Sequence, residues 1–473
     1  MPLERKVYIL DPQQLSPETI AVTFAKTSRS PLSFKEIASE LTDEKSAEFH
    51  EKWVVGFGHA SVAEHAVLHI AIENISRLAV ETLESSRLAS YTEKSTRYQK
   101  WEKNLYYLPN ELKNNTLINL YETTCKQLFD TYSKSIVAVN DVIAIRYPRR
   151  DDESEAEWER RLRPYCVDVC RFLLPSASLA NVGTTINARS LEHIIRKLLS
   201  SPLEEVRSLG QEIKNVSQAE VPTLVKYADA SPYLIGSHDA LTIQAHKVNA
   251  PISNQDWCKL IHYNPEGEEQ ILAASLYRFG QMSYSQALDY VHRSSFEDRQ
   301  DLARALLGNL GPHDIPIREL EYAAFTFDLI LDQGAYFELK RHRMMTQTPQ
   351  ALSTIQGYVI PQLIYQADFL DQYRKTMDAV GDAYSKISEF SPYIASYIVP
   401  NAYKRRVLIT FNLRTAFHLI SLRSAPNAHF SIRLVARRLA EMIRIVSPIL
   451  STYMQISDNE TWKEIEDKYF FAE

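Results

Sequence analysis

The stretch that decides the fold is NARSL, residues 187–191, because a similar stretch, NLRTA, recurs at residues 412–416. In each copy a proline stands twelve residues before the asparagine, since 187 − 175 = 12 and 412 − 400 = 12. Two motifs of one type at one internal spacing indicate an internal repeat. We therefore expect two tandem copies of a single fold.

A second pair of motifs lies upstream, where EHAVLHI at 64–70 matches EYAAFTF at 321–327. From the glutamate to the third residue of the triplet that follows, the intervals are 87 − 64 = 23 and 343 − 321 = 22, which differ by a one-residue indel. Chance similarity between helical segments is the competing interpretation, and two matched spacings favour duplication over it. Residues 226–249, with Pro232 and Gly236 among polar residues, interrupt the pattern and are the predicted junction. The predicted domains are residues 1–228 and 229–473.

Glycine is scarce, with 12 residues in 473, and long stretches carry apolar residues three and four positions apart, which predicts helices. Segments 66–75 and 325–330 are rich in β-branched and aromatic residues and fit strands as well as helices. We expect a helix-rich α/β (α+β) fold in each copy, so that one chain forms a pseudo-dimer. The predicted helices are residues 16–27, 65–84, 115–145, 154–173, 187–200, 204–216, 268–279, 321–343, 365–389, 412–424 and 429–452.

The composition is that of a globular protein with a large core, since 45% of residues are hydrophobic and 24% are charged. A formal net charge of −6 argues against general binding to duplex nucleic acid but leaves room for a small anionic ligand. The start MPLERKVYIL has no signal-peptide pattern and no run is apolar enough to span a bilayer, so we expect a cytoplasmic protein without membrane contact. Cys166 and Cys170 are one helical turn apart, and we interpret them as two thiols on a helix face rather than as a metal site.

Charged motifs are lost from the two halves in alternation. The second half has the basic triplet Arg341-His342-Arg343, where the first half has Ser85-Ser86-Arg87. The loop after the triplet carries charged residues only in the first half, with Ser90, Glu93, Ser95, Arg97 and Tyr98 against Thr346, Pro349, Ala351, Ser353 and Thr354 in the second.

Two further arginines follow the same alternation. The position sixteen before the motif asparagine is Arg171 in the first half (187 − 16) and Ser396 in the second (412 − 16). The position eleven after it is Leu198 in the first half (187 + 11) and Arg423 in the second (412 + 11). Converging guanidinium groups suit a phosphomonoester, whose oxygens they hold by bidentate, charge-assisted hydrogen bonds. One full set of such groups survives when both halves are combined.

These motifs resemble those of the flavin-dependent thymidylate synthase family, over most of both halves and most strongly at 56–101, 166–207, 321–358 and 396–433. The family shares its deoxyuridylate pocket between subunits. The resemblance therefore implies a composite site for a deoxyuridylate-like nucleotide, in which Ser95 is a hydrogen-bond donor, because no base beside it is visible to make it a nucleophile. The residues it implies for substrate binding and catalysis are Glu93, Ser95, Arg97 and Arg171 from the first half and Arg341 and Arg423 from the second.

The resemblance also implies FAD as cofactor, with NADPH and methylenetetrahydrofolate as co-substrates for the reductive methylation of deoxyuridylate, and a homodimer of tandem chains. In this sequence Pro316 stands where His59 would recur, and Asn427 replaces a histidine of the family. The flavin-binding residues that it implies are His59, Ser61, Glu64, Asn187, Arg189, Arg341, His342, Arg343, Asn412 and Arg414.

Three alternatives stay open. The rival hypothesis is a catalytically inactive homologue that binds nucleotide or flavin or has a structural role, which the changes at Ser85, Ser86, Thr92 and Asn427 favour. It also fits flavin-dependent alkylation of another pyrimidine nucleotide. Residues 340–343 fit a solvated helix C-terminus, and Arg171 and Arg423 taken singly fit surface ion pairs. Random substitution would remove motif residues from both halves alike, so their alternating loss favours the composite site.

Overall fold

A computed structural model describes residues 6–97, 101–102, 105–248, 256–456 and 460–472. The chain divides into two compact units, which are described separately. Unit 1 comprises residues 1–94, 106–116 and 178–252, and unit 2 comprises residues 95–105, 117–177 and 253–473. These units depart from the sequence repeat, because residues 95–105 and 117–177 of the first copy pack with the second copy.

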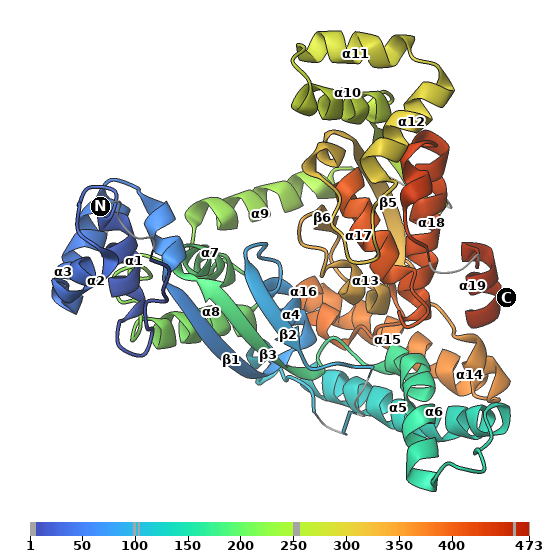
Figure 1. Cartoon of the computed structure of the whole chain (residues 1–473). Helices are drawn as coiled ribbons and strands as arrows, with labels where there is room; N and C mark the ends of the chain where they lie inside the picture. The colour runs from blue at the N-terminus through green and yellow to red at the C-terminus, as the bar shows by residue number, and fades with distance from the viewer. Residues whose placement is uncertain (1–5, 98–100, 103–104, 249–255, 457–459, 473) are drawn as a thin grey trace. The chain divides into compact units, whose positions relative to one another are not determined.

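Unit 1 is built on a three-stranded antiparallel sheet of order β1-β3-β2. Helices α7 and α8 lie along this sheet (Figure 1). The strands are β1 (Val67–Ser76), β2 (Ala89–Glu93) and β3 (Leu179–Asn187). The helices are α1 (Pro17–Lys26), α2 (Phe34–Ser39), α3 (Asp43–Phe49), η1 (His50–Gly56), η2 (Ala60–His65), α4 (Arg77–Leu83), η3 (Asn110–Leu112), α7 (Ala188–Leu199), α8 (Glu204–Ser217) and α9 (Pro232–His246).

Unit 2 is built on a four-stranded antiparallel sheet of order β4-β5-β7-β6, whose apolar face packs with α17 and α18 in one core. The strands are β4 (Cys258–Tyr263), β5 (Ala324–Asp332), β6 (Thr346–Pro349) and β7 (Lys404–Asn412). The helices are α5 (Ile118–Arg146), α6 (Glu155–Cys170), η4 (Arg171–Leu173), α10 (Gly267–Phe279), α11 (Tyr284–Arg293), α12 (Phe296–Leu307), η5 (Arg318–Tyr322), α13 (Gln333–Leu339), α14 (Gln362–Gln366), α15 (Leu370–Phe390), α16 (Pro392–Ala395), η6 (Ser396–Ile398), α17 (Leu413–Arg423), α18 (Phe430–Val446), η7 (Leu450–Tyr453) and α19 (Trp462–Tyr469).

Strand register confirms the internal repeat. Val67 pairs with Asn187 in unit 1, and Ala324 pairs with Asn412 in unit 2, each three residues after the motif glutamate (67 − 64 = 3 and 324 − 321 = 3). Each motif asparagine is the N-cap of the next helix, and its side-chain oxygen accepts a backbone N–H at 2.9 Å. Asparagine is favoured there because it satisfies a donor that the first helical turn leaves unpaired.

The one-residue indel between the copies is a β-bulge. The register of β1 with β3 shifts between Ile72 and Ile75, whereas β5 pairs with β7 without interruption. Asn74 in the bulge has a φ of 58°, a left-handed conformation that asparagine tolerates better than most residues. The extra residue of the first copy is therefore accommodated without changing which side chains face the core.

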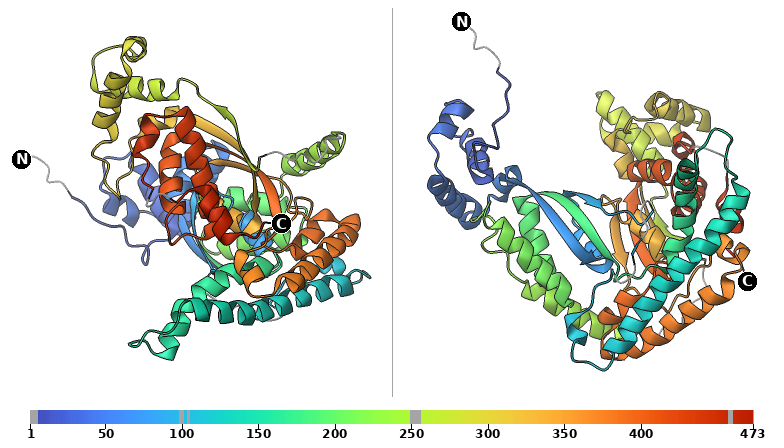
Figure 2. Two further views of the ribbon diagram at one scale, coloured as in Figure 1. Left: turned by 90° about the vertical axis from the view of Figure 1, so that its right-hand side faces the viewer. Right: turned by 90° about the horizontal axis from the view of Figure 1, so that it is seen from below.

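The long helix α5 of the first copy packs lengthwise against α15 of the second copy within unit 2 (cyan and orange in Figure 2). Tyr121, Phe129 and Tyr132 on α5 are fully or almost fully buried, as is Tyr373 on α15. The hydroxyl groups of Thr131 and Thr376 are 3.0 Å apart in this interface. Burying these aromatic side chains contributes on the order of 2 kcal/mol each, which explains why the segment belongs to unit 2.

A buried glutamate recurs near the start of each copy. Glu18 on α1 accepts the backbone N–H groups of residues 223 and 224 at 2.9 and 3.2 Å. Glu268 on α10 accepts those of residues 449 and 450 at 2.9 and 2.6 Å, and the Ser447 hydroxyl at 2.8 Å. Both carboxylates thus bind the chain that follows the last long helix of their copy.

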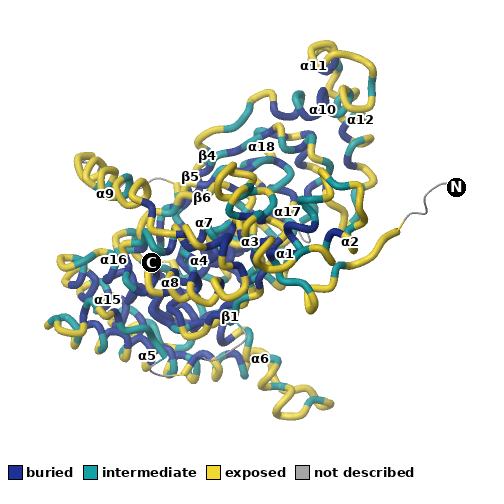
Figure 3. Tube along the Cα trace, turned by 90° about the vertical axis from the view of Figure 1, so that its left-hand side faces the viewer, coloured by how far each residue is buried: buried dark blue, intermediate teal, exposed yellow. Residues whose placement is uncertain are grey.

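The predicted helices correspond to elements of the structure at α1, α5, α6, α7, α8, α10, α15, α17 and α18, whereas other helices, among them α11 and α12, were not predicted. Residues 67–76 and 324–332 form strands, so the strand interpretation of these segments was right and the helical one wrong. Residues 232–246 form helix α9 rather than an irregular junction, because Pro232 occupies the first turn, where no N–H is needed, and Ser231 caps it. None of its residues is buried (Figure 3). Asn249, the predicted end of the junction, lies outside the described residues.

Cys166 and Cys170 lie on α6 as predicted, both buried, with their sulfur atoms 4.0 Å apart. Among the described residues, no helix is both long enough and apolar enough to cross a membrane.

Candidate functional site

The candidate site in unit 2 is centred on Glu338, in the last turn of α13, whose side chain is 9% exposed. Burial disfavours its ionised form, but four nearby arginines outweigh this effect and hold the pKa of the carboxyl below its ordinary value. Glu338 is therefore ionised at neutral pH. The four arginines are Arg97, Arg171, Arg341 and Arg423.

Arg423 is the last residue of α17 and contacts Glu338. Its Nη1 donates to Glu338 Oε2 at 2.7 Å, and its Nε donates to His342 Nε2 at 2.9 Å. Burial and the neighbouring Arg423 lower the pKa of His342 to about 3, so the imidazole is neutral and can accept this hydrogen bond. His342 thus orients Arg423 without adding charge to the cluster.

Arg171 begins the turn η4 that follows α6, and it is 3% exposed. Its guanidinium contacts are long for hydrogen bonds, at 3.8 Å to Glu338, 3.4 Å to Thr96 and 3.5 Å to the carbonyl of Gly334. Its Nε is buried without a hydrogen-bond partner among the described residues. A buried cation with weak contacts is costly, and a bound anion would relieve that cost.

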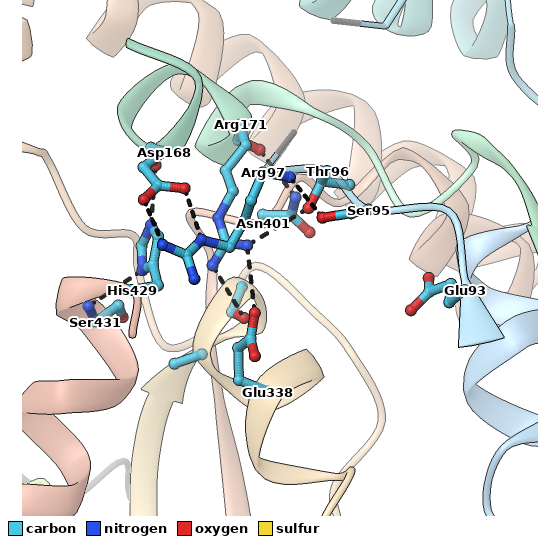
Figure 4. A network of polar contacts seen from close by, with 12 residues as sticks. Glu93, Ser95, Thr96, Arg97, Asp168, Arg171, Glu338, Asn401, His429 and Ser431 are labelled. Atoms are coloured by element: carbon cyan, nitrogen blue, oxygen red, sulfur yellow. Dashed lines mark hydrogen bonds and ion pairs between the residues drawn. The ribbon is translucent and has the colours of Figure 1, made fainter. Parts of the chain in front are cut away.

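Arg97 forms an ion pair with Asp168, a residue of the same copy. Its Nε and Nη2 donate to the two carboxylate oxygens of Asp168 on α6, each at 2.8 Å. Both terminal nitrogens also donate to the carbonyl of Asn427 at 3.2 Å. Figure 4 shows the guanidinium groups of Arg97 and Arg171 side by side, between Asp168 and Glu338.

His429, the N-cap of α18, completes this side of the cluster (Figure 4). Its Nε2 donates to the carbonyl of Asp168 at 2.9 Å, and its Nδ1 accepts the N–H of Ser431 at 3.2 Å. Burial and nearby arginines lower its pKa, so this imidazole is also neutral. The hydrogen bond from His429 to the Asp168 carbonyl links α6 of the first copy to α18 of the second copy.

Four arginines face the two carboxylates Glu338 and Asp168 (4 − 2 = +2), and a third acid near Arg171, Asp332, has its pKa raised by burial. A phosphomonoester carries nearly two negative charges near neutral pH. Arg341 is the exposed member of the set, at the start of the turn after α13. In the first copy, Leu198 at the position of Arg423 is fully buried and apolar, so unit 1 lacks this arginine.

The structure thus brings together Arg97 and Arg171 from the first copy with Arg341 and Arg423 from the second. Ser95 belongs to the same unit, and its hydroxyl accepts the backbone N–H of Arg97 at 3.1 Å. Glu93 belongs to unit 1, at the end of β2, where it forms a 2.8 Å ion pair with Arg77 and its side chain is 2% exposed. Tyr98 of the same loop lies outside the described residues.

The predicted flavin residues fall into two sets of similar geometry. In unit 1, Arg189 pairs with Glu64 at 2.5 Å, and in unit 2, Arg414 pairs with Glu321 at 2.9 Å. Asn187 and Asn412 use their side-chain oxygens as helix N-caps. Arg343 is half-buried and His342 is turned toward Arg423.

His59 and Ser61 line a cavity of about 580 Å³ in unit 1. Aromatic rings form much of its wall, and the guanidinium of Arg29 lies 4.2 Å from the centroid of the Trp53 ring. Phe24 and Trp53 offer surfaces for a planar ring, and Arg29 and His59 offer polar groups at its edge. The cavity therefore has the size and chemistry to hold part of a planar heterocyclic cofactor.

Sequence reasoning missed three members of the site, Glu338, Asp168 and His429. The signal for Glu338 is its position, three residues before Arg341 at the start of the basic triplet. Asp168 likewise precedes Arg171 by three residues. Nothing in the sequence indicates His429, because its partner is a backbone carbonyl from the other copy.

Two copies of one helix-rich fold thus contribute arginines to a single cluster whose chemistry suits an anionic ligand. The chain belongs to the thymidylate synthase complementing protein family, whose model matches residues 12–223 and again residues 259–449. The resemblance and the tandem duplication that the sequence indicated are thereby confirmed.

Relatives of two lengths match the chain. A UPF0159 protein of Chlamydia muridarum is 31% identical over 437 residues, covering 89% of this chain and 82% of the relative. A UPF0159 protein of Thermoplasma acidophilum is 27% identical over 462 residues, covering 89% and 90%. The flavin-dependent thymidylate synthase of Clostridium tetani is 27% identical over 219 residues, which cover 84% of that protein but 46% of this chain. The last match has the extent of one copy.

Proposed function

We propose that this protein is a flavin-dependent thymidylate synthase that methylates deoxyuridylate with methylenetetrahydrofolate and NADPH. The observation that carries the proposal is the cluster around Glu338, in which arginines from both copies share an excess of positive charge inside one compact unit. Family membership and the names of the single-copy relatives support the choice of reaction.

The phosphate of the nucleotide is assigned to the arginine cluster. Arg171 contributes a buried guanidinium whose own contacts are weak, and Arg423 is already oriented by His342. Arg97 and Arg341 add charge from the two edges. Guanidinium groups fixed by surrounding contacts lose little freedom on binding, which favours a precise position of the phosphate.

The uracil ring is assigned to the loop that ends at Arg97. Ser95 donates a hydrogen bond to the base, and Glu93 stays assigned to the substrate as predicted from the resemblance. With the phosphate fixed at one end and the base at the other, the protein orients and polarises the ring rather than forming a covalent bond to it.

FAD is assigned to the two sets of flavin residues, and when bound it supplies the reducing equivalents drawn from NADPH. Phe24, Trp53, His59 and Ser61 around the cavity in unit 1 fit a planar ring, which supports this assignment. Arg189 in unit 1 is a cation suited to a diphosphate, and in unit 2 Arg343 and Arg414 are cations of the same kind. We further propose a cytoplasmic homodimer of tandem chains.

The test is a visible absorption spectrum of the purified full-length protein, followed by titration with deoxyuridylate and an assay for thymidylate in the complete reaction mixture. We expect flavin bands, a change of those bands with NADPH, binding of deoxyuridylate and formation of thymidylate. Absence of flavin binding at micromolar FAD excludes the proposal. Binding of both flavin and deoxyuridylate without product would support the inactive homologue instead.

A further inference from the structure

The carboxylate of Glu338 occupies the centre of the cluster that the proposed function assigns to a phosphate. Its Oε2 accepts from Arg423 Nη1 at 2.7 Å, and its Oε1 lies 3.8 Å from Arg171 Nη1. All three side chains are largely buried, with exposed fractions of 9%, 13% and 3% for Glu338, Arg423 and Arg171. The protein thus holds its own anion against two of the four guanidinium groups.

A carboxylate and a phosphate compete for the same donors. Arg423 gives its Nε–H to His342 and one Nη1–H to Glu338, so the carboxylate already occupies one of the donors that a phosphate oxygen would use. A dianion placed beside an ionised, buried carboxylate is also repelled by it. Conversely, without any anion between them, Arg171 and Arg423 would be buried like charges.

We propose that Glu338 is a resident competitor of the phosphate group, which stabilises Arg171 and Arg423 in the absence of ligand and weakens the binding of any phosphomonoester to them. This inference rests on the proposed function for the identity of the nucleotide, but its physical content concerns phosphate alone. Glu338 therefore sets the affinity of the site, and it keeps the site from retaining free phosphate.

The experiment is calorimetric titration of the full-length protein and of the Glu338→Gln variant, which keeps the side-chain shape and removes the charge. Three probes are used, namely deoxyuridylate, inorganic phosphate and deoxyuridine. We expect Glu338→Gln to bind deoxyuridylate and inorganic phosphate about tenfold more tightly, since one charge-assisted hydrogen bond no longer has to be exchanged. Affinity for deoxyuridine, which lacks the phosphate, should not change.

The matched control is Glu269→Gln, which breaks another partly buried ion pair of the same unit, that of Glu269 on α10 with Arg299 on α12 at 2.6 Å. This control should leave all three affinities unchanged. An unchanged or weaker affinity of Glu338→Gln for phosphate overturns the inference. If inorganic phosphate binds more tightly to Glu338→Gln while deoxyuridylate binds no better than inorganic phosphate, the competitor role stands and the proposed function fails.

A structural measurement covers the case in which Glu338→Gln does not fold. In a crystal structure of the unaltered protein with deoxyuridylate, the Glu338–Arg423 contact of 2.7 Å should be broken and a phosphate oxygen should occupy that donor. An intact Glu338–Arg423 pair with the nucleotide bound overturns the inference.

Discussion

Replacing Arg341 by alanine and comparing it with Arg87→Ala tests whether one site is assembled from both copies. Both residues belong to the triplet region of their copy, Arg341 in the second and Arg87 in the first, and both side chains are exposed. Substituting exposed residues typically changes the free energy of unfolding by no more than about 0.5 kcal/mol, so neither variant should lose its fold. The two variants should therefore differ only in their effect on ligand binding, because Arg341 belongs to the arginine cluster and Arg87 does not.

Arg341 lies close enough to Glu338 to lower its pKa, which places the guanidinium at the edge of the cluster. A hydrogen bond to a charged group contributes roughly 1.5 to 3 kcal/mol, and its loss raises the dissociation constant for deoxyuridylate roughly 10- to 150-fold. Arg87 belongs to the copy in which Leu198 replaces the partner arginine, so Arg87→Ala should change this constant less than about twofold.

Isothermal titration calorimetry of deoxyuridylate into each variant measures both constants, and thermal denaturation verifies that the variants are folded. Deoxyuridine is the control ligand, because its affinity should be the same for both variants. Equal effects of Arg341→Ala and Arg87→Ala on deoxyuridylate binding would refute the composite site.

Three further predictions concern stability and packing. Burial holds the pKa of His342 at about 3, below its ordinary value of 6.5, so its contribution to stability is complete above the ordinary value and is lost as the pH falls toward 3. Urea denaturation at decreasing pH should show a loss of up to about 1.4 kcal/mol per pH unit from this residue, and His342→Gln should reduce the slope. Glu268→Ala removes the acceptor of two buried backbone N–H groups and should lower the free energy of unfolding by about 3 kcal/mol in the same assay. A decrease below about 0.5 kcal/mol would show that these hydrogen bonds contribute little to stability. Gly334→Ala places a Cβ 3.0 Å from Asp332 and 3.5 Å from Arg171, so it should lower the melting temperature and weaken deoxyuridylate binding, and an unchanged affinity would show that Arg171 tolerates the methyl group.

The sequence contained enough information for the repeat and for helices such as α5, α7 and α8, because equal spacings and helical periodicity are properties of the chain itself. It left residues 67–76 and 324–332 undecided, since a short apolar run fits a buried strand and a buried helix equally. Pro232 was misleading, because a proline interrupts a helix only in its interior and here it stands in the first turn. Each failure arises where tertiary packing or end position, not composition, decides the structure.

The arginines of the candidate site were predictable because they differ between copies at equivalent positions. Glu338 and Asp168 were not, since carboxylates are common on helices and their role follows only from the guanidinium groups packed against them. Glu93 belongs to unit 1 and Ser95 to unit 2, although they are only two residues apart. The sequence has no feature that indicates a boundary between compact units at this point. The roles assigned to these residues stay predictions.

Because α5 and α6 of the first copy belong to unit 2, neither compact unit coincides with one copy of the repeat. Severing the gene between the copies would give one product with an orphaned helical hairpin and another without the surface that buries Tyr373. Neither product would be autonomous, although each would contain almost the full length of an ancestral subunit. Cutting the chain between the copies would separate residues that pack together in one compact unit.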